Sequence, residues 1–193
     1  MKTHAIDRCR GCHSSTSTIV TLGAAPLRRC RDCGLVHAPE YADPDEVYVD
    51  GYFSGEVGAF GLDTRDPEFR QFLAFTSERR MQVVESVTRP PGRLLDVGCG
   101  CGELMEVARD HGWDTVGVDL VPGAVKIATE EHGLDVRNTR LEESGLPERS
   151  FDVVCATHVL EHQLDGLGFL ETLARWARPG GHVMIEVPNW ASM

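Results

Sequence analysis

Residues Leu95–Gly102 read LDVGCGCG, and this glycine-rich stretch decides the fold. A β-rich run, Arg93–Val97, leads into it, and a helical run begins at about Glu103. Alternate glycines allow a backbone to turn sharply and to approach a ligand closely. The helix that follows presents unpaired N–H groups and the positive end of its dipole to the loop. The stretch therefore predicts a ligand-binding turn between a strand and a helix.

An acidic residue stands at the end of the next predicted strand. Val116–Asp119 reads VGVD, and Asp119 lies 23 residues after Asp96, about the length of a βα turn, a helix and a strand. A carboxylate there can accept hydrogen bonds from both hydroxyls of a ribose. Nicotinamide dinucleotides are an alternative ligand, but their G-x-G-x-x-G pattern requires glycine where Glu103 stands, and a glutamate repels a pyrophosphate. The pattern favours an adenosyl ligand without phosphates.

Short β-rich runs alternate with helical runs over the rest of the chain, which predicts an α/β fold with a parallel sheet. The Rossmann-like, doubly wound sheet is mainly parallel and has about five strands. The expected strands are Arg93–Val97, Thr115–Val118, Leu134–Arg137, Phe151–Ala156 and His182–Val187, and the expected helices between them are Glu103–Asp110, Pro122–His132 and Gln163–Ala177.

Two C-x2-C pairs precede this region. Cys9 and Cys12 are separated by 17 residues from Cys30 and Cys33, which is the spacing of a zinc ribbon. Each pair can aim two thiolates at one tetrahedral ion, and four thiolates leave no open position, so the zinc is expected to be structural. Two redox-active dithiols are the alternative. The nearby histidines, His4, His13 and His37, are expected to be surface or loop residues, and Ser14–Val20 can supply a strand of the hairpin between the pairs.

The predicted domains are a zinc ribbon over residues 1–40, a linker over 41–66 and the Rossmann-like domain over 67–193. The linker is rich in glycine, proline and aspartate, and Tyr52 and Phe53 within it could cover a ligand or simply anchor the segment. The Rossmann-like domain opens with a helix that is capped by Asp66 and ended by the prolines at 90 and 91.

Composition limits the classes of function. The chain has 193 residues, 41% of them apolar, and a formal net charge of −11. Residues 1–40 carry six basic and three acidic side chains, so the remainder is strongly acidic and nucleic-acid binding is not expected. No apolar run is long enough for a membrane span, and the first residues lack a signal-peptide core, so a cytoplasmic location is expected. The other cysteines, Cys99, Cys101 and Cys155, are expected to be small buried fillers.

The glycine-rich stretch and VGVD resemble the first two motifs of class I S-adenosylmethionine-dependent methyltransferases. Two later segments, Phe151–His162 and Arg178–Gly181, resemble the fourth-strand region and the turn before strand 5 of that family. The cysteine pairs in front resemble a subgroup with an N-terminal zinc-binding domain, which includes sugar methyltransferases of antibiotic pathways. The resemblance implies S-adenosylmethionine and Zn²⁺ as cofactors and a small-molecule methyl acceptor, with a nucleotide-linked sugar as one candidate.

The resemblance also implies roles for single residues. Gly98, Gly100 and Gly102 would line the methionine part of the cofactor, and Asp96 would hold that loop or the amino group. Asp119 would bind the ribose, and Leu120 and Leu141 would flank the adenine. Thr157 and His158 would lie near the methyl group. Candidates for a catalytic base are His158, Glu161 and His162, although His162 is also expected in a structural role that caps or packs the next helix.

The chain departs from that family at its C-terminal end. The family sheet usually has seven strands, and only five are predicted here, so strand 5 is expected to be an exposed edge that could pair with another chain. The chain could be a fragment of a longer protein. The alternative function is a binding module, in which the ribbon acts through a protein or nucleic-acid partner on a cofactor-binding or inactive scaffold. Oligomeric state and acceptor atom are not predicted.

Overall fold

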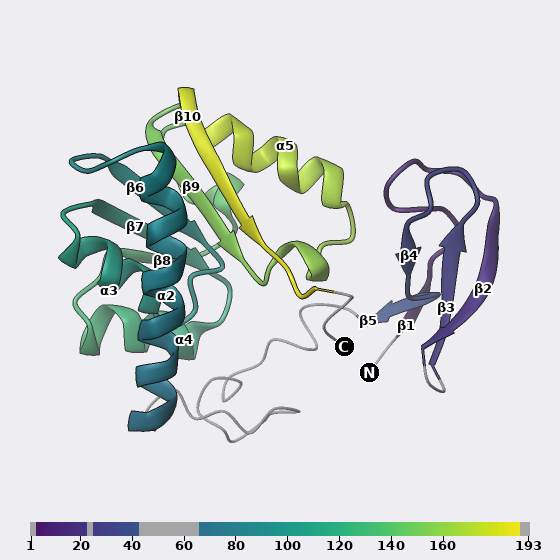
Figure 1. Cartoon of the computed structure of the whole chain (residues 1–193), viewed down its shortest axis with the longest axis horizontal. Helices are drawn as coiled ribbons and strands as arrows, with labels where there is room; N and C mark the ends of the chain where they lie inside the picture. The colour runs from purple at the N-terminus through teal and green to yellow at the C-terminus, as the bar shows by residue number, and fades with distance from the viewer. Residues whose placement is uncertain (1–2, 23–24, 43–65, 190–193) are drawn as a thin grey trace.

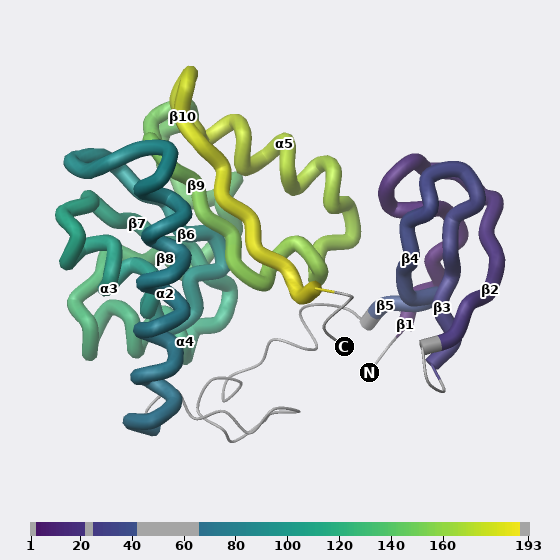
Figure 2. The backbone as a smooth tube through the Cα atoms, in the orientation of Figure 1, coloured from purple at the N-terminus to yellow at the C-terminus, as the bar shows by residue number. Residues whose placement is uncertain are grey.

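The computed structural model describes residues 3–22, 25–42 and 66–189. Figure 1 shows a small all-β part, which is the ribbon, and a larger α/β part. In both Figure 1 and Figure 2 the ribbon lies on the side of the α/β part that carries helix α5. Most of the predicted linker, including Tyr52 and Phe53, lies outside the described residues.

The ribbon contains two small antiparallel sheets. One pairs β1 with β5, and the other has the order β2-β3-β4. The strand that was expected from Ser14 begins only at Ser17, and before it the Ser14 hydroxyl accepts from the backbone N–H of Thr16 at 3.0 Å, a local bond that competes with strand pairing. Pairing of β5 with β1 extends the ribbon's hydrogen bonding to Ala42, two residues beyond the predicted boundary. The strands are β1 (Thr3–Ala5), β2 (Ser17–Leu22), β3 (Ala25–Cys30), β4 (Val36–His37) and β5 (Glu40–Ala42).

A five-stranded parallel sheet forms the α/β part, which confirms the predicted Rossmann-like fold. The strand order is β10-β9-β6-β7-β8, and every neighbouring pair is parallel. The chain builds outward from β6 to β8 and then returns to place β9 on the other side of β6. Ligands bind at such a switch point, beyond the carboxyl ends of the strands. The strands are β6 (Arg93–Val97), β7 (Asp114–Asp119), β8 (Val136–Asn138), β9 (Phe151–Thr157) and β10 (Ala177–Glu186).

Helices cover both faces of this sheet. Met81 and Val84 of α2 pack with Leu104 of α3 in one cluster, while Leu173 and Trp176 of α5 belong to another, on Phe151 and its neighbours. The predicted cap at Asp66 is confirmed, since its carboxylate accepts from the backbone of residues 68 and 69. The helices are α2 (Pro67–Val87), α3 (Glu103–Asp110), α4 (Pro122–Lys126) and α5 (Gly166–Trp176), with short turns η1 (Ile127–Glu131), η2 (Leu141–Glu143) and η3 (Leu160–His162).

Several boundaries differ from the prediction. The helix that was expected over Pro122–His132 becomes a π-helix from Ile127, where the Thr129 hydroxyl donates to the carbonyl of Val125. The helix that was expected from Gln163 begins at Gly166, because the Asp165 carboxylate accepts from the backbone N–H of residue 168 and so caps it.

Two strands also differ. Strand β8 begins at Val136 instead of Leu134, since pairing with β7 starts at Gly117 opposite Val136. Strand β10 begins at Ala177, five residues early, because Ala177 already pairs with Phe151 before a register shift. In the described part of the chain β10 pairs only with β9, so it is an edge strand.

Other expectations concern burial. Cys99, Cys101 and Cys155 are all buried, as expected. None of the helices in the described ranges is both long and apolar enough to cross a membrane.

Helices α2 and α3 are joined by a histidine that lies between two carboxylates. His111 Nδ1 lies 2.9 Å from Glu85 Oε1, and its Nε2 lies 3.1 Å from Glu78 Oε2. The hydrogen bond to Glu85 raises the pKa of His111 above its ordinary value. A histidine with a raised folded-state pKa stabilises the fold fully below its unfolded pKa, and this stabilisation is lost as pH rises through the folded pKa.

We therefore predict that His111→Gln lowers the free energy of unfolding by about 1 kcal/mol at about pH 6. Most of the difference should disappear at about pH 9, where the wild-type imidazole is neutral. Urea unfolding of both proteins at the two pH values measures this. An equal cost at both values would show that the imidazole acts by packing and not by charge.

Candidate functional site

A cavity of about 350 Å³ opens at the carboxyl ends of β6, β7 and β9. Arg80 and Leu73 of α2 close one side of it. Seven of the predicted site residues line it, and they come from the ends of these strands and the segments that follow them: Gly98, Gly100, Asp119, Leu120, Thr157, His158 and His162. The tertiary structure thus brings three separate motifs to one place.

The glycine loop needs glycine for two distinct reasons. Gly98 has φ +71°, and a Cβ there would lie 2.5 Å from Val159 Cγ2. Its N–H donates to the carbonyl of Val118 at 2.8 Å, which ties the loop to β7. Gly102 has φ +93° at the start of α3, and a Cβ there would overlap Leu134 Cδ1. Gly98 therefore keeps the cavity open, whereas Gly102 lets α3 begin close to Leu134 and does not line the cavity.

Asp119 holds two of the loops together. Its Oδ2 accepts from the N–H of Gly100 at 2.8 Å, and its Oδ1 accepts from the N–H of Val121 at 2.8 Å. The side chain is only 8% exposed, and burial raises its pKa above the ordinary value. Each carboxylate oxygen can accept a further hydrogen bond. The Asp119 carboxylate is therefore held at the edge of the cavity, where it can accept hydrogen bonds from a ligand. The exposed side chain of Leu120 lies beside it.

Asp96 lies beneath the glycine loop. It is 1% exposed, and its Oδ1 accepts no hydrogen bond from any residue that the structure describes. Burial raises its pKa to about 7, against the opposing charge of Arg80. Burial likewise raises the pKa of Glu103, which lines the cavity at the start of α3. An unsatisfied buried carboxyl is costly unless a ligand compensates for it.

The charges around the cavity favour a cation. Asp119 and Glu103 line it, Asp96 lies behind it, and Arg80 is the sole arginine or lysine among the described lining residues. A phosphate group would meet repulsion from these acids, whereas a sulfonium or ammonium group would relieve it. The residues present therefore fit S-adenosylmethionine, which the sequence predicted.

His158 occupies a strained position at the mouth of the cavity. Its φ is +56°, which is uncommon for residues other than glycine, although histidine adopts it more often than most residues. Its Nε2 lies 3.1 Å from Glu186 Oε1, and its Nδ1 lies 3.3 Å from Glu161 Oε1. Backbone strain of this kind persists where surrounding contacts fix it, and it concentrates at functional sites.

Two residues of this network were not predicted. Arg80 donates to both carboxylate oxygens of Glu186, from Nε at 3.0 Å and from a terminal nitrogen at 2.6 Å. These hydrogen bonds lower the pKa of Glu186. The two residues are 106 positions apart, on α2 and β10, so no local motif could have paired them. The sequence offered no signal that separates Arg80 from its neighbour Arg79.

Two further predicted residues, Leu141 and Glu161, do not line this cavity. Leu141 is buried in the core cluster on which α5 packs. Glu161 contacts His158, and its carboxylate also lies 3.9 Å from His162 Nε2. The roles that were predicted for these residues stay predictions.

The four N-terminal cysteines form a compact cluster of free thiols. Their sulfur atoms all lie within 4.8 Å of one another, with Cys9 and Cys33 at 3.5 Å and Cys12 and Cys30 at 3.5 Å. A tetrahedral zinc ion with bonds of about 2.3 Å needs sulfurs about 3.8 Å apart, whereas a disulfide needs about 2.05 Å. The cluster fits a single metal ion and does not fit two closed disulfides.

Backbone N–H groups form hydrogen bonds to some of these sulfur atoms. The N–H of Gly11 donates to Cys9 Sγ at 3.4 Å. A hydrogen bond from the backbone of Cys33 lowers the pKa of Cys30 to about 6, whereas hydrogen bonds with neighbouring thiols raise the pKa of Cys12 and of Cys33. The backbone hydrogen bonds stabilise thiolates, which are the form that binds zinc.

Residues 64–192 match the sequence profile of a family that is described as a methyltransferase domain. The chain belongs to this methyltransferase domain family. The ubiquinone biosynthesis O-methyltransferase of Methylococcus capsulatus is 32% identical to it, over 73% of this chain and 64% of that protein. The 2-methyl-6-phytyl-1,4-hydroquinone methyltransferase of Synechocystis is 36% identical, over 53% of this chain and 34% of that protein.

A solved structure agrees with the fold. The SAM-dependent methyltransferase from Archaeoglobus fulgidus gives a TM-score of 0.53 and 26% identity, over 63% of this chain and 54% of that chain. The methyltransferase domain described here spans only about half the length of the curated relatives that it matches.

The glycine loop of the methyltransferase domain gives a direct test of the cavity. Gly98→Ala places a methyl group against Val159 and forces a positive φ on alanine, and it should weaken S-adenosylmethionine binding by more than about 10-fold. Gly133→Ala is the matched control, since Gly133 has φ +64° but nothing lies within 4 Å of its Cβ position. The control should lose about 1 kcal/mol of stability and keep its affinity. Calorimetric titration and thermal unfolding separate the two, and equal affinities would show that the cavity binds no cofactor.

Proposed function

We propose that this chain binds S-adenosylmethionine in the cavity over the glycine loop and directs its methyl group to a small-molecule acceptor. The observation that carries the proposal is Asp119, a buried carboxylate that is anchored by Gly100 and Val121 at the edge of a cavity lined by acids. The family membership supports it independently.

The binding roles follow from position. Asp119 accepts hydrogen bonds from the ribose hydroxyls, and the exposed side chain of Leu120 lies against the adenine. Gly98 and Gly100 leave room for the methionine part, and the acidic side chains of Asp119 and Glu103 at the cavity favour its cationic groups. Leu141 is buried in a core cluster, and its contact with the other face of the adenine stays a prediction.

When bound, the cofactor supplies an electrophilic methyl group whose departure leaves a neutral thioether. The chain's main task is therefore to align the acceptor with that methyl group. An acceptor hydroxyl also needs a base. Both ring nitrogens of His158 lie near carboxylates, so His158 is proposed to position the mouth of the cavity. His162 lines the cavity from η3 and is proposed as the base, with Glu161 beside it.

The acceptor is open to two proposals. The relatives named above act, by their names, on ubiquinone precursors and on a phytyl hydroquinone, which supports a hydroxylated ring as the acceptor. A nucleotide-linked sugar, which was suggested by the resemblance of the cysteine pairs, is the other proposal. Zn²⁺ in the ribbon is proposed to be structural, because Cys9, Cys12, Cys30 and Cys33 would fill all four positions.

The test combines binding with turnover. Wild type should bind S-adenosylmethionine in calorimetric titration and transfer radiolabelled methyl groups to a panel of hydroxylated rings and sugar nucleotides. His162→Asn should lower kcat by about 10²–10⁴-fold and leave cofactor affinity unchanged. His13→Asn is the control, because His13 is a ribbon residue with φ +58° that asparagine tolerates. Absence of cofactor binding by the folded chain would reject the proposal, and binding without any transfer would favour the inactive scaffold.

A further inference from the structure

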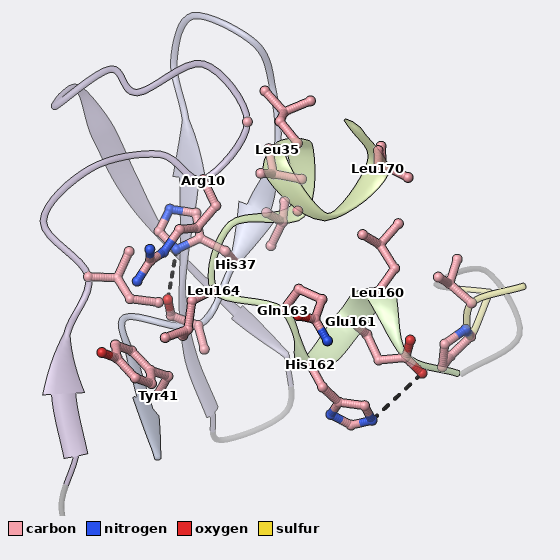
Figure 3. A pocket seen from close by; sticks show the side chains of 18 of the residues that line it. Arg10, Leu35, His37, Tyr41, Leu160, Glu161, His162, Gln163, Leu164 and Leu170 are labelled. Atoms are coloured by element: carbon pink, nitrogen blue, oxygen red, sulfur yellow. Dashed lines mark hydrogen bonds and ion pairs between the residues drawn. The ribbon is translucent and has the colours of Figure 1, made fainter. Parts of the chain in front are cut away.

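A second cavity, of about 770 Å³, lies between the ribbon and the methyltransferase domain. Figure 3 shows Arg10, His37 and Tyr41 of the ribbon facing the segment that carries Leu160, Glu161 and His162. Its volume is typical of sites for small organic ligands. The ribbon therefore forms one wall of a space that neither part encloses alone.

The walls of this cavity are largely apolar. Leucines on the domain side face apolar residues of the ribbon, and two of the lining side chains, Leu35 and Leu167, keep 40% and 45% of their surface exposed. When an apolar ligand covers apolar surface that is exposed inside a concave site, the free energy of the complex falls, so such surface favours apolar ligands. The apolar wall consists of Leu35, Val36, Leu160, Leu164, Leu167 and Leu170.

The two cavities meet at His162 and Gln163, which line both of them. Methyl transfer needs the acceptor atom about 3–3.5 Å from the reacting carbon and in line with it. Among the described residues, His162 and Gln163 are the only two that line both cavities, so a molecule in the larger cavity comes next to the cofactor cavity there. Its reactive end must therefore lie at His162, while its body lies between the ribbon and α5.

The charges of the larger cavity are unfavourable for a diphosphate. Among the described lining residues Arg10 is the only arginine or lysine, and its guanidinium faces the ring of Tyr41 at 5.5 Å. Glu40 and Glu161 also line the cavity. Sites for phosphate groups gather several basic side chains or backbone N–H groups, and two carboxylates oppose such a ligand.

From these observations we infer the class of the acceptor, an inference that rests on the proposed function. The acceptor is a small molecule with a mainly apolar body that lies between the ribbon and α5, and with a nucleophilic hydroxyl that lies at His162. A nucleotide-linked sugar does not meet these conditions. The ribbon thereby acts as part of the acceptor site.

The probes for the test are hexyl-substituted phenol, catechol and hydroquinone, with thymidine diphosphate glucose as the nucleotide-linked comparison. Each is titrated into the full chain in the presence of S-adenosylhomocysteine. At least one hexyl probe should bind, and Leu167→Asp should weaken that binding by more than about 10-fold, because it places a charge on the apolar wall. Val83→Asp, at an exposed valine of α2 outside both cavities, should leave it unchanged.

The outcomes separate the two proposals. If S-adenosylhomocysteine does not bind to the folded chain, the proposed function fails. Equal binding of S-adenosylhomocysteine to wild type and Leu167→Asp shows that the variant keeps its cofactor site. If no hexyl probe then binds to the wild type, the acceptor class is wrong. It is also wrong if the variant binds the hexyl probe as tightly as the wild type does. Binding of thymidine diphosphate glucose in place of the hexyl probes would also overturn it.

Discussion

Asp119→Asn should lower the affinity of the chain for S-adenosylmethionine by about 100-fold. The carboxylate accepts from the N–H groups of Gly100 and Val121, and it is proposed to accept from the ribose as well. An amide keeps one acceptor oxygen and turns an NH₂ group toward one of these donors. Loss of a hydrogen bond to a charged group costs about 1.5–3 kcal/mol, so one such loss at the ligand accounts for this effect.

The matched control is Asp114→Asn, the same change at the other end of β7. Asp114 is exposed and pairs with Arg93, far along the strand from the cavity. Its affinity should equal that of the wild type in calorimetric titration. Thermal unfolding of both variants shows whether the loop itself has been lost. Unchanged affinity of a stably folded Asp119→Asn protein would remove the ribose assignment.

Cys30→Ser should abolish zinc binding and unfold the ribbon while the methyltransferase domain stays folded. So short a segment buries little apolar surface, and a structural zinc site supplies about 10–16 kcal/mol of apparent binding free energy. Hydrogen-exchange protection of β2 and β3 should disappear, whereas that of β6 and β7 should persist. Cofactor affinity should change by less than about 2-fold, because none of the described ribbon residues lines the cofactor cavity.

Metal analysis provides the primary measurement. The wild type should contain one zinc ion per chain, and Cys30→Ser should contain none. Cys101→Ala is the control, since Cys101 is buried beside α4 and lies outside the cluster. It should retain one zinc ion. A ribbon that stays protected without metal would show that its hydrogen bonds alone sustain it.

Much of the fold could be predicted because it depends on local patterns. The run before Gly98 and the valines before Asp119 specify buried parallel strands, and the structure confirms them. Boundaries that depend on a single side chain were missed. Asp165 caps α5 three residues later than expected, and a hydroxyl at Thr129 accompanies the change to a π-helix. Each of these boundaries depends on a single hydrogen bond, and the spacing of apolar residues in the sequence does not predict such a bond.

The sequence by itself determined the strand–loop–helix unit at Gly98, the acid one crossover later and the grouping of four thiols. Each follows from residues that are close in the chain or from a fixed spacing. Only the tertiary structure decided that Arg80 donates hydrogen bonds to Glu186 and that His158 lies between two carboxylates. It also decided that the ribbon lines a cavity beside His162. Those contacts join segments that are distant in the chain, and their geometry depends on how helices and ribbon pack on the sheet.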